Sequence, residues 1–154
     1  MPSGSADLRL LWLEVTAHIG DRVLILPVSV VESAVKDDSN SHSIAGYGNF
    51  DSQLVGPEIP KGSRVYRAIF ADARGQATLN SYDAVAKLFD NRLKSAEKRR
   101  ESYQFTIPEG AKGDVSIEAT LKYLPYSSIF TDRLGLQKPE AVIVAQKKIE
   151  LVAR

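Results

Sequence analysis

The chain has 154 residues, of which 44% are hydrophobic and 25% are charged, and its formal net charge is +1 at pH 7. This composition is typical of one globular domain, and it excludes an overall field that would draw the chain onto nucleic acid or anionic lipid. The sequence holds no cysteine, which excludes disulfides, thiolate zinc sites and a CxxCH haem attachment within these residues. We therefore expect a single domain over residues 1–154 and no nucleic-acid partner.

The chain is predicted to begin with a β-hairpin. Residues 8–19, LRLLWLEVTAHI, alternate as a strand does, and one side carries these apolar residues: Leu11, Leu13, Val15 and Ala17. A Gly-Asp pair at 20–21 predicts a tight turn into a second strand over 22–31, in which Pro27 indicates a sheet edge or a bulge. These apolar runs are too short to span a bilayer, which takes about 20 residues.

A long surface loop is expected over residues 32–62, which are rich in Ser, Asn, Asp, Gly and Pro. Within it, KDDSNSH at 36–42 gathers hard oxygen ligands of the kind that calcium prefers: Asp37, Asp38 and Asn40. The spacing and closing glutamate of an EF-hand are missing, and Asx-rich turns are common without an ion. Calcium is therefore only a weak alternative for this loop.

The second half of the chain predicts more strands and one helix. Residues 64–72 alternate like a strand and end in the turn DARG. Residues 81–93 are predicted to form a short helix, with Ser81 as its cap and one apolar side: Val85, Leu88, Phe89 and Leu93. Three further strands are expected after this helix, over residues 102–108, 114–124 and 141–153.

About seven strands joined by turns and two long loops favour an antiparallel, immunoglobulin-like β-sandwich. The second of those loops is YLPYSSIFTDRLGLQKPE at 123–140, which contains two prolines. Parallel crossovers would need a helix in nearly every connection, and the pattern offers only one helix. The expected fold class is therefore all-β.

A basic run lies within LFDNRLKSAEKRRESYQFTI at 88–107, and it contains the candidate interaction residues Lys98, Arg99 and Arg100. Such a run can bind an acidic partner, form the solvent-exposed face or end of a helix, or be a solvent-exposed connector between two strands. Because the net charge of the whole chain is close to zero, nucleic acid is not the expected partner. A solvated connector is the favoured interpretation.

No catalytic signature is present. The sequence contains no GxSxG, HExxH, P-loop or GxGxxG pattern, and we expect no catalytic residue and no enzyme activity from this chain. The two histidines, His18 and His42, lie 24 residues apart in separate contexts, which does not predict a metal site or a catalytic triad. Both are expected to have ordinary surface roles.

A family resemblance adds to these observations. PSGSADLRLLWLEVTA at 2–17, VYRAIFADARG at 65–75, FDNRLKSAEKRRESYQFTIP at 89–108 and VSIEATLKYL at 115–124 resemble, in the same order, a segment of multihaem c-type cytochromes that follows the haem-bearing region. The residues that carry the likeness are Pro2, Gly4, Arg9, Trp12, Tyr66, Arg67, Asp90, Arg92, Tyr103, Phe105 and Pro108.

The resemblance implies a haem-free C-terminal β-sandwich of a periplasmic or outer-surface electron-transfer protein. Haem c would then be bound upstream of this chain, and no haem ligand of the family falls on a residue here. The implied partner is the haem-bearing domain of the same polypeptide or a redox partner protein. A buried contact between Asp90 and Arg92 is the structural role that the resemblance suggests for that motif.

The alternative is a stand-alone extracellular β-sandwich module that binds protein or carbohydrate. It predicts an exposed aromatic platform, for which the candidates are Trp12, Tyr47, Phe50 and Tyr126. Trp12 has apolar neighbours in the sequence, and packing in the core is the favoured interpretation for it.

Overall fold

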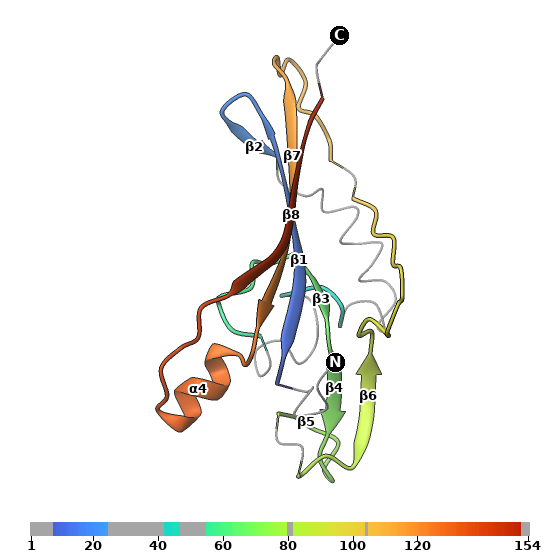
Figure 1. Ribbon diagram of the computed structural model, residues 1–154, viewed down its shortest axis with the longest axis vertical. Helices are drawn as coiled ribbons and strands as arrows, with labels where there is room; N and C mark the ends of the chain where they lie inside the picture. Colours follow the sequence, from blue (N-terminus) through green and yellow to red (C-terminus); the bar gives the residue numbers. More distant parts are fainter. Residues whose placement is uncertain (1–7, 25–41, 47–54, 80–81, 104, 152–154) are drawn as a thin grey trace.

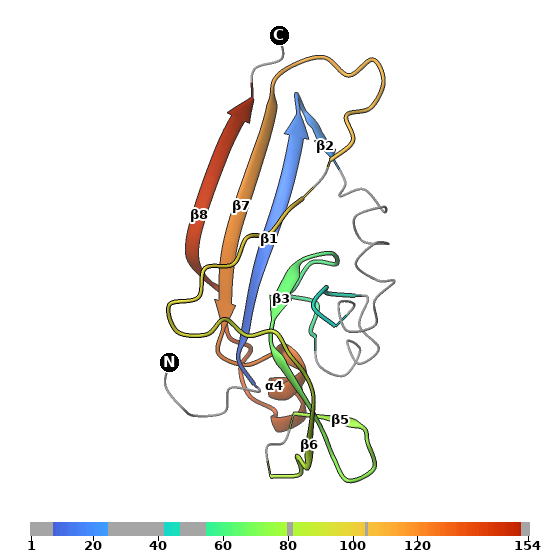
Figure 2. The same ribbon diagram turned by 90° about the vertical axis from the view of Figure 1, so that its right-hand side faces the viewer.

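The structure is a computed structural model that describes residues 8–24, 42–46, 55–79, 82–103 and 105–151. Over these residues it is all-β and sandwich-like, with two antiparallel sheets and one short helix, which confirms the predicted fold class (Figures 1 and 2). The five strands of the larger sheet are β1 (Leu10–Ile19), β2 (Arg22–Leu24), β3 (Arg64–Tyr66), β7 (Val115–Leu124) and β8 (Val142–Leu151).

β1 is central in the larger sheet. It pairs with β7 on one side, and with β2 and β3 at different heights on the other side. The predicted turn at Gly20–Asp21 joins β1 to β2, and Gly20 takes a positive φ of 54° that suits glycine. β8 pairs with β7 and forms the outer edge of the sheet, as Figure 2 shows.

The smaller sheet is built around β4, which almost continues β3. Its strands are β4 (Ala68–Ala71), β5 (Ala77–Thr78) and β6 (Ala86–Asp90), in the order β5-β4-β6. The predicted strand over 64–72 is therefore divided at Arg67 between the two sheets. The predicted turn after β4 is present, because Asp72 Oδ1 accepts the N–H groups of Arg74 and Gln76, both at 2.9 Å.

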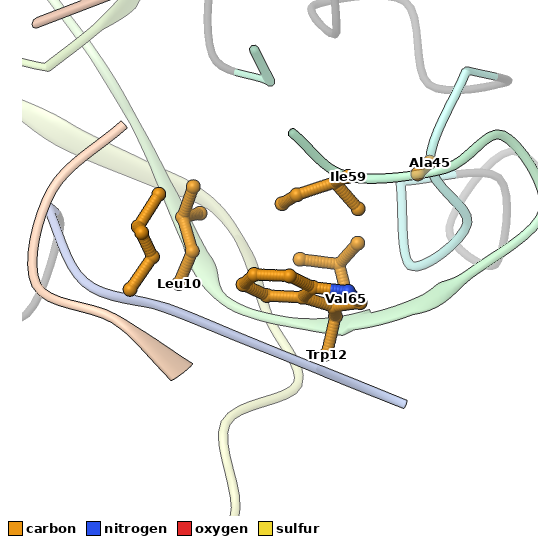
Figure 3. Packing of buried hydrophobic residues seen from close by; sticks show 6 residues of the cluster. Leu10, Trp12, Ala45, Ile59 and Val65 are labelled. Atoms are coloured by element: carbon orange, nitrogen blue, oxygen red, sulfur yellow. The ribbon is translucent and has the colours of Figure 1, made fainter. Parts of the chain in front are cut away.

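The main core surrounds Trp12, which is 0% exposed (Figure 3). The other buried members of this cluster are Leu10, Ala45, Ile59, Val65 and Leu124. Trp12 therefore packs in the core, as predicted. It lies on the opposite side of β1 from Leu13 and Val15, so the structure covers both sides of the strand at this end.

The two sides of the larger sheet differ in polarity. Directly opposed residues of β1, β7 and β8 form rows, of which one is Ala17, Ile117 and Ile149 and another, on the same side, is Leu13, Leu121 and Ala145. The other side carries the polar rows, including Glu14 beside Thr120 and Thr16 beside Glu118. We call the first side, which holds Ala17, Ile117 and Ile149, the apolar face.

The predicted helix over 81–93 is wrong. Residues 86–90 form strand β6 instead, and β6 pairs with β4 from Ala68↔Asp90 to Ala71↔Ala86. The apolar side that predicted the helix finds little cover, since Val85 is 68% exposed and Leu88 is 45% exposed. Ladder hydrogen bonds to β4 therefore outweigh a helical spacing that has little to pack against. The residue expected to cap the helix, Ser81, lies outside the described residues.

The helix that the described residues contain lies in a connection that the sequence predicted as a loop. This helix, α4 (Ser128–Leu134), begins after Ser127, whose side chain accepts the Phe130 N–H at 3.4 Å, and ends at Gly135, which has a φ of 65°. Glu58 accepts two bonds from Ser128 at its first turn, at 2.9 Å and 2.6 Å. Within the described residues no helix is long and apolar enough to cross a bilayer.

The predicted strand at 102–108 is also wrong. Its described residues are irregular and belong to a connector that runs from Asn91 to Asp114 across the apolar face (Figure 2). Phe105 packs there with Ala17, Ile19 and Leu24, so its apolar character is used for packing and not for strand pairing. The other two predicted strands are β7 and β8, while most of 22–31, with Pro27, lies outside the described residues.

Candidate functional site

The connector, residues 91–114, begins at Asn91, which joins it to the break between β3 and β4. Asn91 Oδ1 accepts the Arg67 N–H at 2.8 Å, and Asn91 Nδ2 donates to the Val65 carbonyl at 2.9 Å. The Asn91 N–H also donates to the Arg67 carbonyl at 3.0 Å. Because Val65 and Arg67 are buried, these bonds satisfy backbone groups that water does not reach.

Arg67 is itself buried, with 2% of its surface exposed. Its Nε donates to the backbone carbonyl of His42 at 2.9 Å, which fixes the segment around His42 against β3. The His42 ring lies 5.5 Å from the ring of Phe89 on β6. Arg67 of the Tyr66–Arg67 motif is thus buried and bonds the segment around His42 to the break between β3 and β4, which is a structural role.

Arg99 stabilises the middle of the connector through bonds to two other connector residues. Its NH1 donates to the Asn91 carbonyl at 2.6 Å, and its Nε donates to Glu97 at 2.9 Å. Its guanidinium also lies over the Tyr66 ring, 5.7 Å from the ring centre, where a cation–π contact is favourable. Arg99 was predicted as an interaction residue, but these contacts use its charge inside the chain.

Its neighbours Lys98 and Arg100 behave differently. All three residues are exposed, but neither Lys98 nor Arg100 forms a salt bridge with any described residue, whereas Arg99 pairs with Glu97. Of the three basic residues, Arg99 is therefore bonded within the connector, and Lys98 and Arg100 are the two cations that could pair with a partner.

A cluster of two tyrosines lies where the connector approaches β3. Tyr66 donates from its hydroxyl to Glu101 at 3.1 Å, and the same carboxylate pairs with Arg64 at 3.2 Å. Burial, together with the charge of Glu101, raises the pKa of Tyr66 well above its ordinary value. Burial also raises the pKa of Tyr103 to about 12, against the opposing effect of the nearby Arg64.

The Tyr103 hydroxyl is buried without a hydrogen-bond partner among the described residues. It lies near Arg64 and Glu101, whose charges shift its pKa in opposite directions, and Tyr103 is one of the residues that line the space between the connector and the sheet. Both phenols therefore stay protonated at neutral pH.

A groove of about 550 Å³ separates the connector from the apolar face. Its floor consists of half-buried aliphatic residues from β1 and β7: Leu13, Val15, Ile117, Ala119 and Leu121. Its rim on the connector side is polar and includes Glu97, Arg99 and Glu101. The arrangement suits contact with an apolar surface or side chain.

The Asp90–Arg92 contact is present, but it lies at the surface and not in the interior. Arg92 donates from Nε and NH2 to the two carboxylate oxygens of Asp90, at 2.9 Å and 2.8 Å. Lys87 adds a third bond at 3.1 Å. These bonds, those of Arg92 first, hold the pKa of Asp90 well below its usual range. The motif therefore fixes the end of β6 where the connector begins.

Other predicted residues are placed as follows. Phe105 lines the groove, the Pro108 carbonyl accepts the Ala111 N–H at 3.1 Å in an exposed turn, and Arg9 precedes β1. His18 is half-buried on the polar side of β1. The remaining candidates lie outside the described residues, namely Pro2, Gly4, Asp37, Asp38, Asn40, Tyr47 and Phe50.

The aromatic platform that a stand-alone binding module needs is not assembled by the described candidates. Trp12 is in the core, and Tyr126, 36% exposed, leans on Phe130 with ring centres 6.3 Å apart. Within the described ranges no three His, Cys, Asp or Glu side chains converge as a metal site would require. Neither a protein-family model, nor a curated protein, nor a solved structure matches this chain.

Proposed function

We propose that this chain is a non-catalytic interaction domain that docks on the haem-bearing domain of a multihaem c-type cytochrome. The observation that supports it is the division of charge in the connector. Arg99 is bonded to Asn91 and Glu97 within the connector, while Lys98 and Arg100, which are likewise exposed, form no salt bridge with a described residue on the segment that borders the groove. A fixed backbone that presents two outward cations next to aliphatic surface suits an acidic partner with an apolar border.

The resemblance supplies the identity of that partner. Haem carries two propionate groups, and acidic haem edges fit a pair of exposed cations better than a phosphate backbone would, given a net charge of only +1. Electron transfer belongs to the haem domain in this proposal. The present chain contributes docking and a rigid frame. The resemblance implies a location in the periplasm or on the outer cell surface.

The first experiment concerns the parent polypeptide. The proposal requires CxxCH motifs in the coding sequence that adjoins this domain, and covalent haem in the expressed product. A parent without CxxCH motifs overturns the cytochrome assignment outright.

The second experiment measures docking between this chain and the separately produced haem-bearing part. The double variant Lys98→Glu/Arg100→Glu should weaken docking, raising the dissociation constant roughly three- to thirtyfold, with a smaller effect at high salt. A matched control is Arg22→Glu/Arg74→Glu, which makes the same change of charge at exposed positions outside the connector. Equal losses in the two variants, or no loss in the first, contradict docking through the connector.

A further inference from the structure

β8 has an open edge along its whole length. β7 occupies one side of it, and among the described residues no strand pairs with the other side. All ten residues from Val142 to Leu151 are exposed, including Ile149 at 46% and Leu151 at 51%. A long apolar edge strand is a template for pairing with another strand, and natural proteins usually shorten or cover such an edge.

The apolar face continues onto β8 without the cover that it has elsewhere. The connector packs over β1 and β7, where Phe105 and Ala111 belong to the same cluster as Ile117. Ile149 lies directly opposite Ile117, and Leu151 lies directly opposite Val115, so both extend apolar rows that start under the connector. Within the described part of the chain these rows end at solvent, at the outer edge of β8.

The part of β8 that can accept a regular partner is its C-terminal half. The pairing with β7 shifts between Leu121 and Lys122, which leaves Val144 as the extra residue of a bulge. From Ala145 to Leu151 the alternation is regular, with Lys148 and Glu150 on the polar side and Lys147 on the apolar face. Lys148 and Glu150 form a salt bridge at 3.0 Å in the exposed edge.

We propose that β8 pairs antiparallel with β8 of a second copy of this chain, about a two-fold axis midway between Ile149 and its copy. A two-fold axis perpendicular to the sheet keeps the apolar faces of both copies on the same side. Because directly opposed residues of an antiparallel pair share a side, that axis must lie level with a residue, so that this residue opposes its own copy. The proposal does not depend on the haem domain.

Charge selects Ile149 among the possible centres. An axis level with Lys147, Lys148 or Glu150 opposes that residue to its own copy, and like charges directly opposite destabilise a sheet. An axis level with Ile149 instead opposes Lys148 to Glu150 of the second copy, and does so twice by symmetry. The same register opposes Ile149 to itself, which joins the rows of Ile117 and Ile149 into one continuous apolar row.

Lys147 is the residue that argues for an unpaired edge, since a lysine on the inward side commonly discourages pairing. In the proposed register Lys147 lies opposite Leu151 of the second copy. Its four-carbon stem can cover that leucine while the ammonium group reaches water at the rim. The lysines therefore help to set the register, because a two-fold axis level with residue 147 or 148 would oppose two lysines. Lys147 does not prevent pairing of the edge.

The absence of cysteine allows a direct test of the register. Ile149→Cys places two thiols opposite each other on the axis, within the distance that a disulfide spans. Gln146→Cys places its thiols six residues out of register, roughly 20 Å apart, where no disulfide forms. Val23→Cys, at an exposed position of β2, measures random collision.

The proposal predicts rapid oxidation of Ile149→Cys to a covalent dimer, and little product from the other two variants. It also predicts that the wild-type mass in sedimentation experiments rises with concentration toward twice 16.9 kDa. A chain that stays monomeric at all concentrations, or an Ile149→Cys variant no faster than Val23→Cys, overturns it. Faster oxidation of Gln146→Cys than of Ile149→Cys overturns the register.

A charge exchange gives a second test that leaves Ile149 intact. Lys148→Glu places a carboxylate opposite Glu150 of the second copy at two symmetric places, and association should weaken roughly tenfold. Glu150→Lys should have a similar effect, and the double variant Lys148→Glu/Glu150→Lys should recover most of the loss. Failure of the double variant to recover association contradicts the opposed pairs, whatever the outcome of docking to a haem domain.

Discussion

β1 and β8 are strands of equal length in the same sheet, and they differ completely in burial. β1 contains four buried apolar residues, Leu10, Trp12, Ala17 and Ile19, whereas every residue of β8 is exposed. The difference comes from the other segments of the chain that pack over each strand. The segments around Ala45 and Ile59 cover one side of β1 and the connector covers the other, while neither cluster includes a residue of β8. Alternation in a strand therefore shows which side can be buried, and a distant segment decides whether it is.

Substitution of Trp12 should have the largest effect on this contrast. Trp12→Ala removes the largest buried side chain and should lower the free energy of unfolding by about 3–5 kcal/mol in denaturant titration. Ile143→Ala, at a 55% exposed position of β8, is the matched control and should cost less than about 1 kcal/mol. Similar losses at the two positions would contradict the assignment of the core to β1.

Asn91 should come next, because it satisfies buried backbone groups of Val65 on β3 and of Arg67 at the break. Asn91→Ala leaves the Arg67 N–H and the Val65 carbonyl without their bonds, at a cost of about 1–3 kcal/mol in the same measurement. Asn91→Asp keeps the acceptor for the Arg67 N–H but sets a carboxylate oxygen against the Val65 carbonyl, so it should also lower the free energy of unfolding. A loss below about 0.5 kcal/mol for the alanine variant would show that water replaces the amide there.

The buried tyrosines should make stability fall in alkali. The pKa of Tyr103 is about 12 in the folded chain and near 10 when unfolded, so its stabilising effect is complete below pH 10 and is lost as pH rises toward 12. The loss for this residue should be on the order of 2 kcal/mol across that window. Tyr103→Phe should flatten the profile above pH 10, and a wild-type profile without a slope there would contradict the burial of this phenol.

Asp90 should give the smallest effect, since its ion pairs lie at the surface. Its pKa is depressed, so its contribution is present above the unfolded pKa and is lost as pH falls through the folded value. Asp90→Asn should cost about 0.3–1 kcal/mol at neutral pH, after allowance for solvent screening. The difference between wild type and variant should shrink in acid, and a difference that grows on acidification would contradict this sign.

The sequence predicted the long strands well, because β1, β7 and β8 each combine alternation with a length that few other structures fit. It failed between 81 and 108, where Val85, Leu88 and Phe89 have helical spacing but the open edge of β4 takes the segment as β6. The helix α4 was missed although Ser127 and Gly135 mark both of its ends, since seven residues give too short an apolar pattern.

The site was predicted only where its contacts are local. Asp90 and Arg92 are two residues apart, and their pairing was expected from the motif. Asn91 lies between them and bonds to Arg67, 24 residues away, while Tyr66 bonds to Glu101, 35 residues away. Contacts at such separations depend on the path of the connector across the sheet, which no local spacing encodes. The different roles of Arg99 and its basic neighbours could not be predicted either, because Arg99 contacts Tyr66, which is distant in the sequence.

Hydrogen exchange of β8 at low and high protein concentration tests most directly whether its open edge is an interface. We expect alternate amides between Lys147 and Leu151 to exchange more slowly as concentration rises, because their outward N–H groups gain carbonyl partners on the second copy. Amides of β2, at the opposite edge of the sheet, should not respond. Exchange in β8 that is fast and independent of concentration would contradict pairing at this edge.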